Sequence, residues 1–599
     1  MRCGEKSTSA KALSETIGHG YSFLIGGRTR EAAECGRRAL EVQSGNAKAL
    51  QLMELIAFRE GDYTREANCL QKVVAAGPEN PNRLNHLGAA LSAAGRQKEA
   101  AAFFRRALAA APGNAAIWIN LGLALKGCAV LGEAVQSFKQ ALLLDPNNPE
   151  CWLNLGSTLS DMGRHDEAEV IFRQALRLRP NFGKAYNNLG NTLRASGRVH
   201  DAIESFRQAL RAMPDSIGAM NNLGNALRAA GRFTEAERFY RRALASYPDS
   251  AETCCNLGNV QCDDRRYDEA LASYNRALQL NPEFAEVHFN RAWIYLLRAQ
   301  FTEGWEEYAW RLRRPAWIAG APGRISLPAW HGEPFTGRRL LIYDEQGFGD
   351  TIQFARYLPM VKALGGTTIF EARPNLLSLF KSLKGVDRLV ARQSIERPAA
   401  TEADAYVPLL SLPRLFRTDL LSIPWHGAYL QADPPLQLRW QGRLGRERFR
   451  IGIVWSASQV DPLRVCPAAA FAWLGRFPEV GIYSLQKDAI QTTVANDLPG
   501  VVHLGPEFND FGDTAAVLAN LDLIISVDTA VAHLSGAMAK RTWVLLPYAA
   551  DWRWLEDRED SPWYPTMRLF RQKKWGDWQD VMERVAEAFR HHFGLRVAA

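Results

Sequence analysis

The sequence predicts an α-solenoid in the first half of the chain and an α/β region in the second. The first prediction depends on a pattern of residue types that recurs every 34 residues, which is typical of stacked helical hairpins. The second depends on short apolar runs that alternate with helical stretches once that period stops, which predicts parallel strands joined by helices. At 599 residues the chain is also too long for a single hydrophobic core, so several domains are expected.

Composition excludes several other classes of protein. The hydrophobic fraction of 47% and the charged fraction of 23% are ordinary for a soluble globular protein. The net charge of +8 arises from 72 basic residues mixed with 64 acidic ones, which predicts a solvated surface and no nucleic-acid partner. The 9 cysteines are scattered without CxxC spacing, which argues against a disulfide framework or a zinc site. The sequence has no apolar stretch of signal-peptide or membrane-spanning length, so we expect a soluble, cytoplasmic protein.

The pair Leu-Gly marks the repeating unit. Its leucines stand 34 residues apart, at Leu87, Leu121, Leu155, Leu189, Leu223 and Leu257. An alanine, an aromatic residue and a proline follow at fixed places in each unit, as Ala168, Phe172 and Pro180 do after Leu155. On a helical hairpin, the alanine allows the two helices to approach, the aromatic ring fills the space between them, and the proline ends the second helix.

This period and order of residue types closely resemble the tetratricopeptide repeat (TPR) family. The resemblance implies a superhelix with a long concave surface. Weaker copies of the pattern extend the array at both ends, at Gly61, Tyr63, Ala67 and Pro78 and again at Trp293, Phe301, Trp305 and Tyr308. We therefore predict an N-terminal tail over residues 1–11 and about eight repeats over residues 12–312, with a degenerate first repeat that acts as a cap.

An asparagine stands directly before the repeated leucine, or its equivalent, in six units. This asparagine column consists of Asn120, Asn154, Asn188, Asn222, Asn256 and Asn290. An amide both donates and accepts hydrogen bonds, so such a column can pair with an extended peptide backbone of any sequence. The column resembles the asparagine ladder in the TPR domain of eukaryotic O-linked N-acetylglucosamine transferase, which implies that it binds an acceptor polypeptide. The alternative is that each asparagine only hydrogen-bonds the neighbouring repeat.

A linker over residues 313–338, rich in proline and glycine, precedes the α/β region. Its Trp317 and Trp330 are expected to dock on a neighbouring surface. Buried strands are expected at residues 340–343, 367–371, 451–455, 481–485, 523–527 and 542–546. They divide into one lobe at 339–435 and a second lobe at 449–599 that ends in a helix. Ligands of parallel sheets bind at the carboxyl ends of the strands.

The turn after the first expected strand carries Gly347, Gly349 and Asp350. The glycines allow a tight turn, whereas the dinucleotide-binding GxGxxG pattern and the P-loop lysine are absent. The turn resembles the Gly-Asp turn of the heptosyltransferase-like glycosyltransferases. This resemblance implies a GT-B-like pair of Rossmann-type lobes, and it implies that Asp350 is the general base for the acceptor hydroxyl. The alternative is that Asp350 is only a helix N-cap.

A second turn leads from a buried strand into a helix at Asp528, Thr529 and His533. The free N–H groups at a helix start form a ready site for an anion. The string resembles the Asp-Thr-x-x-x-His donor-binding signature of the same family, which implies that it holds the nucleotide diphosphate. The alternative is that His533 only packs between the helix and the sheet.

Further donor-binding candidates follow two other strands. Ser456 ends one of them, and Gln486 and Lys487 end the next, where a lysine is suited to stabilise charge on the departing phosphate. Arg464 is the basic residue of the loop at 458–466, which carries fewer polar groups than the same loop in related transferases. No Asp-x-Asp follows a strand, so we expect no metal and assign charge stabilisation to helix termini, Lys487 and Arg464.

Together these features predict a bacterial-type protein O-glycosyltransferase that needs no metal, and the family resemblance implies inversion at the anomeric carbon. It would move a sugar from a nucleotide-sugar to a serine or threonine of a polypeptide held by the repeats, for example a flagellin. No cofactor is expected beyond the nucleotide-sugar co-substrate. Two alternatives stay open, namely a transferase that acts on a cell-surface glycan and a non-catalytic TPR scaffold or export adaptor.

Overall fold

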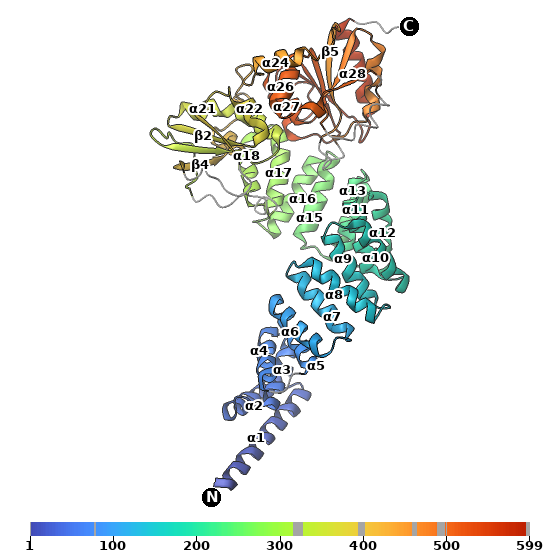
Figure 1. Ribbon diagram of the computed structural model, residues 1–599, viewed down its shortest axis with the longest axis vertical. Coiled ribbons are helices and arrows are strands. Elements are labelled where there is room, and N and C mark those ends of the chain that lie inside the picture. The colour runs from blue at the N-terminus through green and yellow to red at the C-terminus, as the bar shows by residue number, and fades with distance from the viewer. Residues whose placement is uncertain are drawn as a thin grey trace. The chain divides into compact units, whose positions relative to one another are not determined.

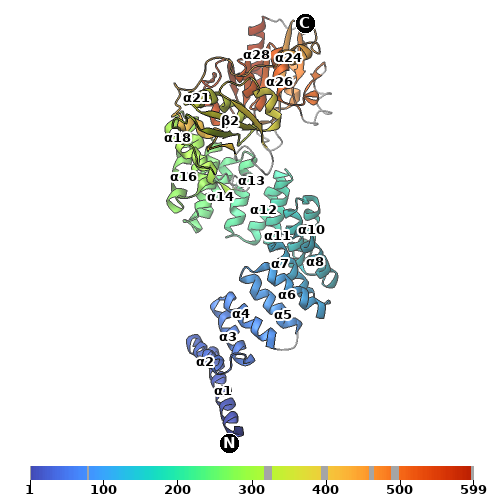
Figure 2. The ribbon, with the colours of Figure 1, turned by 60° about the vertical axis from the view of Figure 1, so that its left-hand side comes forward.

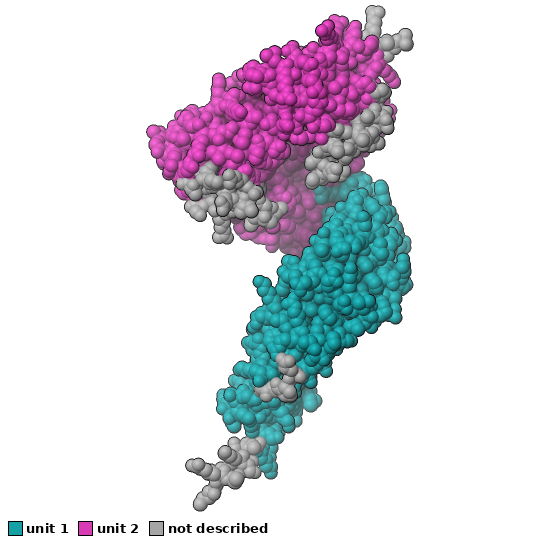
Figure 3. Space-filling view, in the orientation of Figure 1, with its two compact units in different colours: residues 1–248 teal, residues 249–599 magenta. Residues whose placement is uncertain are grey.

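The computed structural model describes residues 2–76, 80–315, 327–392, 402–457, 464–487, 498 and 500–594. The chain forms two compact units, residues 1–248 and residues 249–599 (Figure 3). Pro78 and Trp317, which the sequence analysis singles out, lie outside the described residues.

The first unit consists of helices that pair into hairpins (Figures 1 and 2). Its helices are α1 (Arg2–Ile25), α2 (Thr29–Val42), α3 (Ala47–Glu60), α4 (Tyr63–Ala76), α5 (Pro81–Ala93), α6 (Gln97–Ala110), α7 (Ala115–Gly127), α8 (Leu131–Leu144), α9 (Pro149–Asp161), α10 (His165–Leu178), α11 (Gly183–Ala195), α12 (Val199–Ala212), α13 (Ile217–Ala229) and α14 (Phe233–Ser246). Each odd-numbered helix packs against the helix that follows it, and successive hairpins pack side by side, so this unit is a helical solenoid.

The hairpin of α9 and α10 illustrates how the repeated residues build this fold. Asn148 caps α9 by accepting a hydrogen bond from the Cys151 N–H at 3.0 Å. Leu155 and Phe172 are buried between the helices, as predicted. A Cβ atom on Gly156 would lie 2.7 Å from the Phe172 ring, which explains why glycine follows the repeated leucine.

Two details at the N-terminal end differ from the sequence prediction. Helix α1 begins at Arg2, so residues expected as a tail over 1–11 are helical from that point. The described residues also form nine hairpins, counting those of both units, where about eight were expected. The additional one is α1 with α2, which lacks the markers of the 34-residue period but still buries Ile17 and Leu24.

The last two hairpins belong to the second unit, together with the α/β region. They are formed by α15 (Ala251–Asp263), α16 (Tyr267–Leu280), α17 (Ala285–Leu297) and α18 (Phe301–Tyr308). The Trp305 indole N–H donates to the Thr418 carbonyl at 2.9 Å, and the ring packs edge-on against Trp552 at 5.4 Å. Because such buried aromatic contacts join the final repeats to the α/β region, the compact units divide at Pro248 and not at the end of the repeats.

Two parallel sheets form the remainder of the second unit. The first has the strand order β3-β2-β1-β4, with β1 (Arg339–Tyr343), β2 (Thr367–Ala372), β3 (Arg388–Ala391) and β4 (Ala405–Pro408). The second has the order β10-β9-β8-β5-β6-β7, with β5 (Phe449–Val454), β6 (Val480–Ser484), β7 (Val502–His503), β8 (Leu523–Val527), β9 (Thr542–Leu546) and β10 (Met567–Arg571). Every neighbouring pair is parallel.

Helices connect these strands. Those of the first lobe are α20 (Phe348–Phe354), α21 (Leu358–Ala363), α22 (Leu377–Phe380) and α23 (Leu412–Leu415). Those that accompany the second sheet are α24 (Pro434–Gln441), α26 (Phe511–Ala519), α27 (Ala530–Ala537) and the terminal α28 (Trp578–Phe593), which confirms the expected final helix.

The six predicted strands are confirmed as β1, β2, β5, β6, β8 and β9. The four strands that the sequence analysis missed are the edge strands of the two sheets, β3, β4, β7 and β10. Arginines interrupt the apolar residues of β3 and β10, at Arg388 and Arg568, whereas β7 spans only two residues and β4 is apolar but only four residues long.

Trp330 of the expected linker is buried, as predicted. Its backbone N–H donates to the Tyr406 carbonyl at 2.8 Å, and its ring packs against Phe335. In the part of the chain that the structure describes, no helix combines the length and the apolar composition that crossing a bilayer requires.

Candidate functional site

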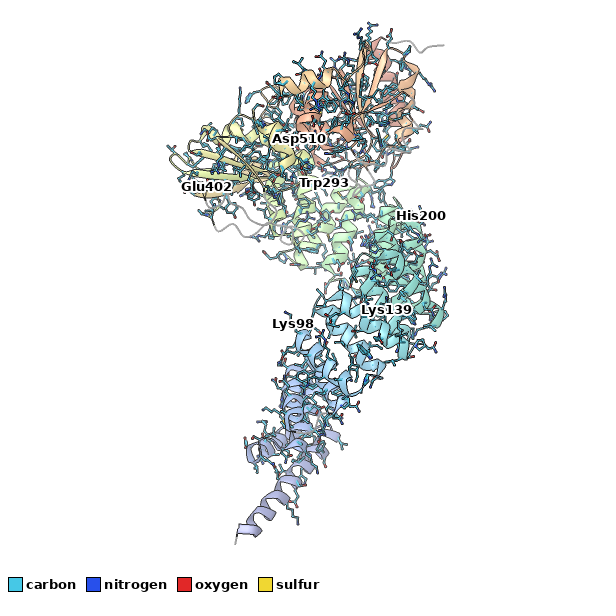
Figure 4. All side chains as sticks on the ribbon, in the orientation of Figure 1. Lys98, Lys139, His200, Trp293, Glu402 and Asp510 are labelled. Atoms are coloured by element: carbon cyan, nitrogen blue, oxygen red, sulfur yellow. The ribbon has the colours of Figure 1, made fainter. Side chains whose placement is uncertain are left out.

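A cavity of about 820 Å³ lies in the second unit, at the carboxyl ends of β1, β5, β6 and β8. Helix α17 of the last repeat contributes to its wall, so Trp293 and Asp510, both labelled in Figure 4, line the same cavity. All residues predicted to be catalytic or donor-binding line it, namely Gly347, Gly349, Asp350, Ser456, Arg464, Gln486, Lys487, Asp528, Thr529 and His533. The structure therefore brings together segments that are far apart in the sequence, while their individual roles remain predictions.

Sheet topology explains why the cavity forms at this place. In the second sheet, the first strand in sequence, β5, lies next to β8, and the chain proceeds outward in opposite directions from this pair. In the first sheet β1 lies next to β4 in the same manner. Connecting helices leave opposite faces of a sheet at such a switch point, which opens a crevice at the carboxyl ends of the strands. Ser456, Asp528 and Asp350 all follow strands that border a switch point.

Asp350 lies in the first turn of α20 and uses both carboxylate oxygens. Its Oδ2 accepts from the Gly347 N–H at 2.8 Å, and its Oδ1 accepts from Arg553 Nη2 at 2.5 Å. The N-cap residue of α20 is Gly347, so the alternative in which Asp350 is itself the N-cap is wrong. Asp350 is instead the third residue of the helix, and its carboxylate accepts a hydrogen bond from the N–H of the cap residue.

Arg553 forms the ion pair with Asp350, and no pattern in the sequence predicts this pairing. It follows β9 in a short 3-10 turn, and only 8% of its side chain is exposed. Its Nε donates to Gln353 Oε1 at 2.8 Å and its Nη1 donates to Asp551 Oδ1 at 2.8 Å. Burial alone would lower the pKa of the Arg553 guanidinium, but the carboxylates of Asp551 and Asp350 raise it above the ordinary value.

Asp528 is buried at the end of β8 between two nitrogen-bearing side chains. Its Oδ2 lies 3.2 Å from Arg464 Nη1, and its Oδ1 lies 3.7 Å from His533 Nε2. Burial alone would raise the pKa of the Asp528 carboxyl, but Arg464 and His533 outweigh that effect and lower its pKa below the ordinary value. Asp528 is therefore a carboxylate at neutral pH.

Thr529 and His533 occupy the first turn of α27. Thr529 is the N-cap, since its hydroxyl accepts from the Ala532 N–H at 3.4 Å. His533 is buried, hydrogen-bonds the Tyr564 hydroxyl through Nδ1 at 3.1 Å and stacks on Trp554. Its ring thus packs against aromatic residues that follow strands, and not against a strand as the alternative states, and it also lines the cavity, as the donor-binding prediction requires.

Gly349 allows the two lobes to approach at this point. A Cβ atom there would lie 2.7 Å from His533 Cδ2 and 3.4 Å from the Ala530 Cα. The packing of α20 against α27 therefore favours glycine here. The tight turn expected from the sequence is not the reason, because Gly349 lies within α20 and its φ is not positive.

The residues after β5 and β6 meet at the other side of the cavity. The Ser456 N–H donates to Gln486 Oε1 at 3.2 Å. Lys487 is exposed, and among the described residues it forms no ion pair. Its ammonium group is therefore available to an anionic ligand.

Other residues of the cavity have no motif in the sequence. Arg373 donates to the buried Asp344 at 2.8 Å and to the Thr351 hydroxyl at 3.0 Å, and its guanidinium lies over the Phe348 ring. Phe289 and Trp293 of α17 also line the cavity. Trp293 could be noticed only as a repeat marker, and nothing in the spacing relates it to the turn at Asp350. Among the described residues, no group of three or more His, Cys, Asp or Glu side chains is arranged to hold a metal ion.

The residues of the asparagine column are all half-buried, and they divide into two kinds. Asn120 donates to Asn85, Asn222 donates to Asn187 and Asn290 donates to Asn259, at 3.0, 2.9 and 2.8 Å. These three bonds join neighbouring repeats, as the alternative interpretation predicts. No side-chain hydrogen bond to a described residue is formed by Asn154, Asn188 or Asn256. Internal bonding therefore explains only part of the column.

Comparisons with known proteins agree with the architecture of the first half. One family model, described as the C-terminal domain of cilia and flagella-associated protein 70, matches residues 28–254. The tetratricopeptide repeat model matches residues 251–284. The helical hairpins are tetratricopeptide repeats. Neither match extends into the α/β region, which here consists of two parallel sheets.

Among curated proteins, the TPR chain is similar to protein FlbA of Caulobacter vibrioides. The two are 30% identical over 332 residues, which is 51% of this chain and 55% of FlbA, so the chain spans about half the length of that relative. The solved structure of YrrB, a TPR protein with an unusual peptide-binding site, is similar at 21% identity and a TM-score of 0.28, covering 31% of this chain and 97% of YrrB. The Cut9–Hcn1 hetero-tetramer of APC/C is similar at 19% identity and a TM-score of 0.34, covering 48% of this chain and 60% of that one.

Proposed function

We propose that this chain is a protein O-glycosyltransferase whose catalytic site is the cavity between the two parallel sheets. The observation that supports it most is the convergence of all ten predicted catalytic and donor-binding residues on this one cavity. They come from four different strand ends, and nothing in the repeat pattern requires them to meet. A cavity of about 820 Å³ has the size typical of small-molecule sites. The two sheets then correspond to the lobes of a GT-B-like transferase.

The proposed reaction is an inverting displacement. The hydroxyl oxygen of a serine or threonine attacks the anomeric carbon, and the bond from that carbon to the diphosphate oxygen breaks with its electron pair. The proton of the hydroxyl goes to the Asp350 carboxylate. The departing diphosphate lies at the N-terminus of α27 behind Thr529, where Lys487 and Arg464 offset its charge.

The TPR array would supply the acceptor. Asn154 and Asn188 have no side-chain hydrogen bond to a described residue, so their amides can pair with a bound backbone without breaking an existing contact. A protein partner, for instance of the flagellin type, is therefore the proposed acceptor. A reaction that consumes a nucleotide-sugar also fits a cytoplasmic location.

Two assays with the purified full chain test this function. A panel of nucleotide-sugars is screened for donor hydrolysis, and the active donor is then incubated with candidate acceptor proteins and analysed by intact mass. The proposal predicts that one donor adds a discrete sugar mass to one acceptor, and that Asp350→Asn binds this donor but does not transfer the sugar. Transfer by Asp350→Asn at the wild-type rate would remove Asp350 from the mechanism.

A non-catalytic scaffold is the second candidate. It is favoured by the fact that both family-model matches, at residues 28–254 and 251–284, lie within the repeats. A scaffold requires a protein partner but no donor turnover. The same panel separates the two candidates, because a scaffold would bind its partner and hydrolyse none of the nucleotide-sugars.

A further inference from the structure

Five charged side chains alternate in sign across the proposed active site, and the imidazole of His533 follows the last of them. This charge chain runs in order through Asp350, Arg553, Asp551, Arg464, Asp528 and His533. All six line the cavity. Its first member lies in the first lobe, and the other five lie in the second, so the chain connects the proposed base with the proposed donor site.

The ion pairs of the charge chain near Asp350 are short and largely buried. Arg553 lies 2.5 Å from Asp350 and 2.8 Å from Asp551, measured from its two Nη atoms to the nearest carboxylate oxygens. The exposed fractions of these side chains are 8% for Arg553, 19% for Asp350 and 13% for Asp551. Three carboxyl and amide groups share this guanidinium, since Gln353 accepts from its Nε. A change in the strength of the Asp551–Arg553 ion pair therefore alters the strength of the Arg553–Asp350 ion pair.

The ion pairs of Arg464, near the proposed donor site, are longer and more exposed. Arg464 lies 3.2 Å from Asp528 and 3.9 Å from Asp551, and 34% of its side chain is exposed. Longer and more solvated ion pairs are weaker, so Arg464 exchanges partners at a lower cost than Arg553 does. Asp528, by contrast, is buried and charged, so it competes with any anion for Arg464.

The charges of the cavity indicate why an exchange is needed. Its described lining carries four arginine or lysine residues (Arg373, Arg464, Lys487 and Arg553) and four aspartates (Asp350, Asp510, Asp528 and Asp551). A nucleoside diphosphate adds negative charge to a lining that is already balanced. Arg373 is committed to the buried Asp344, and Arg553 is almost fully buried. Lys487 and Arg464 are the most exposed of these four cations.

We propose that Arg464 is a shared counterion that exchanges Asp528 and Asp551 for the donor diphosphate. Asp551, relieved of Arg464, then binds Arg553 more strongly and weakens the hydrogen bond from Arg553 to Asp350 Oδ1. That oxygen becomes available to accept the acceptor proton only when the donor is in place. This inference rests on the proposed transferase function and makes Arg464, Asp551 and Arg553 positioning residues for Asp350.

Calorimetric titration of the full chain with UDP, GDP, CDP, ADP and inorganic pyrophosphate tests the exchange. In Asp551→Asn a competitor for Arg464 is removed, so the diphosphate that binds wild type should bind about threefold to tenfold more tightly. Arg464→Gln should bind it about tenfold more weakly. In the double variant, the Asp551→Asn change should no longer tighten binding, because the cation it competed for is absent.

Donor hydrolysis gives the second readout. Asp551→Asn removes one of the two carboxylates that pair with Arg553 and thereby strengthens its pairing with Asp350, so kcat should fall while the nucleotide binds more tightly. A merely structural role for Asp551 would instead weaken binding and turnover together. Asp551→Glu restores the charge and should recover part of kcat.

Asp510→Asn is the matched control, because it removes a charge from the same cavity at a residue not paired with Arg464. Asn caps a helix as well as Asp does, so the start of α26 is retained. Equal tightening in Asp510→Asn and Asp551→Asn would indicate a general charge effect and overturn the inference. Unchanged or weaker binding in Asp551→Asn would overturn it as well. If wild type binds none of the five probes, the proposed function itself is contradicted, and the inference fails with it.

Discussion

Arg311 at the end of the last repeat and Glu345 at the end of β1 form a buried two-point ion pair. Arg311 Nη2 lies 2.7 Å from Glu345 Oε1, and Arg311 Nε lies 3.0 Å from Glu345 Oε2. Arg311 also donates to the Ser411 hydroxyl, and Glu345 accepts from the Leu410 N–H. The pair joins the final TPR hairpin to the lobe that carries Asp350, and all of these elements belong to the second unit.

Removal of one member of this buried ion pair should therefore destabilise the second unit. Arg311→Met leaves the Glu345 carboxylate buried without a counterion, and it should lower the free energy of unfolding of the second unit by about 3–5 kcal/mol. Chemical denaturation followed by fluorescence checks this. Arg313→Met is the control, because the Arg313–Glu283 pair is exposed and should change stability by less than about 1 kcal/mol. Equal effects of the two variants would contradict the assigned role of Arg311.

Asp350→Asn should retain donor binding and lose turnover. The amide keeps the shape of the side chain but cannot accept the hydroxyl proton, so kcat should fall by about 10²–10⁴. Steady-state kinetics and donor titration measure the two quantities separately. A loss of donor binding with unchanged kcat would assign Asp350 to the donor site instead.

Arg553→Lys should distinguish the contribution of the positive charge of Arg553 from that of its planar hydrogen-bonding geometry. Lysine keeps the positive charge, but its single ammonium group cannot reach Asp350, Asp551 and Gln353 as the planar guanidinium does. We expect kcat to fall by about tenfold or more, with donor affinity changed by less than about threefold. If Arg553→Lys had wild-type kcat, Arg553 would contribute charge alone.

Gly349→Ala should disturb the contact between α20 and α27. The added Cβ would meet His533 Cδ2 at 2.7 Å, so the ring must leave its present position at the cavity wall, and donor affinity should fall. A cost of about 1–3 kcal/mol in stability is expected for such overpacking. Gly113→Ala is the matched control, since a Cβ there has open space and should change neither quantity. Unaltered donor affinity in Gly349→Ala would contradict the placement of His533 at the donor site.

The asparagine column makes a separate prediction about the acceptor. Replacing Asn154 and Asn188 with Ala removes amides that form no side-chain hydrogen bond to a described residue, so stability should hardly change. The acceptor KM should rise by about tenfold, as expected when two hydrogen bonds to a bound backbone are lost, while donor hydrolysis is unaffected. The exposed Asn147→Ala serves as control. An unchanged acceptor KM would assign the column to packing between repeats.

Much of this architecture was predictable because its signals are local. The 34-residue pattern of Leu155, Ala168 and Phe172 determines each hairpin through contacts within one repeat. The strands β5 and β8 are continuous apolar runs because they are buried on both faces. The glycine turn before Asp350 could also be located in the sequence, because it directly follows the apolar run of β1.

The partners of these residues could not be predicted, because they come from distant parts of the chain. Arg553 lies 203 residues after Asp350, and the loop that carries it has no motif. The pairing of Arg464 with Asp528 depends on the adjacency of β5 and β8, which only the strand order reveals. The entry of Trp293 into the cavity depends on the docking of the last repeat, which the buried Arg311 pair stabilises.

The most direct measurement is intact mass spectrometry of proteins from the native cell, comparing the unaltered gene, a deletion and the Asp350→Asn variant. The proposed function predicts that one abundant protein carries a discrete sugar mass only in the strain with the unaltered gene. A sugar mass that persists in the Asp350→Asn strain, or proteins that are identical in all three strains, would contradict it.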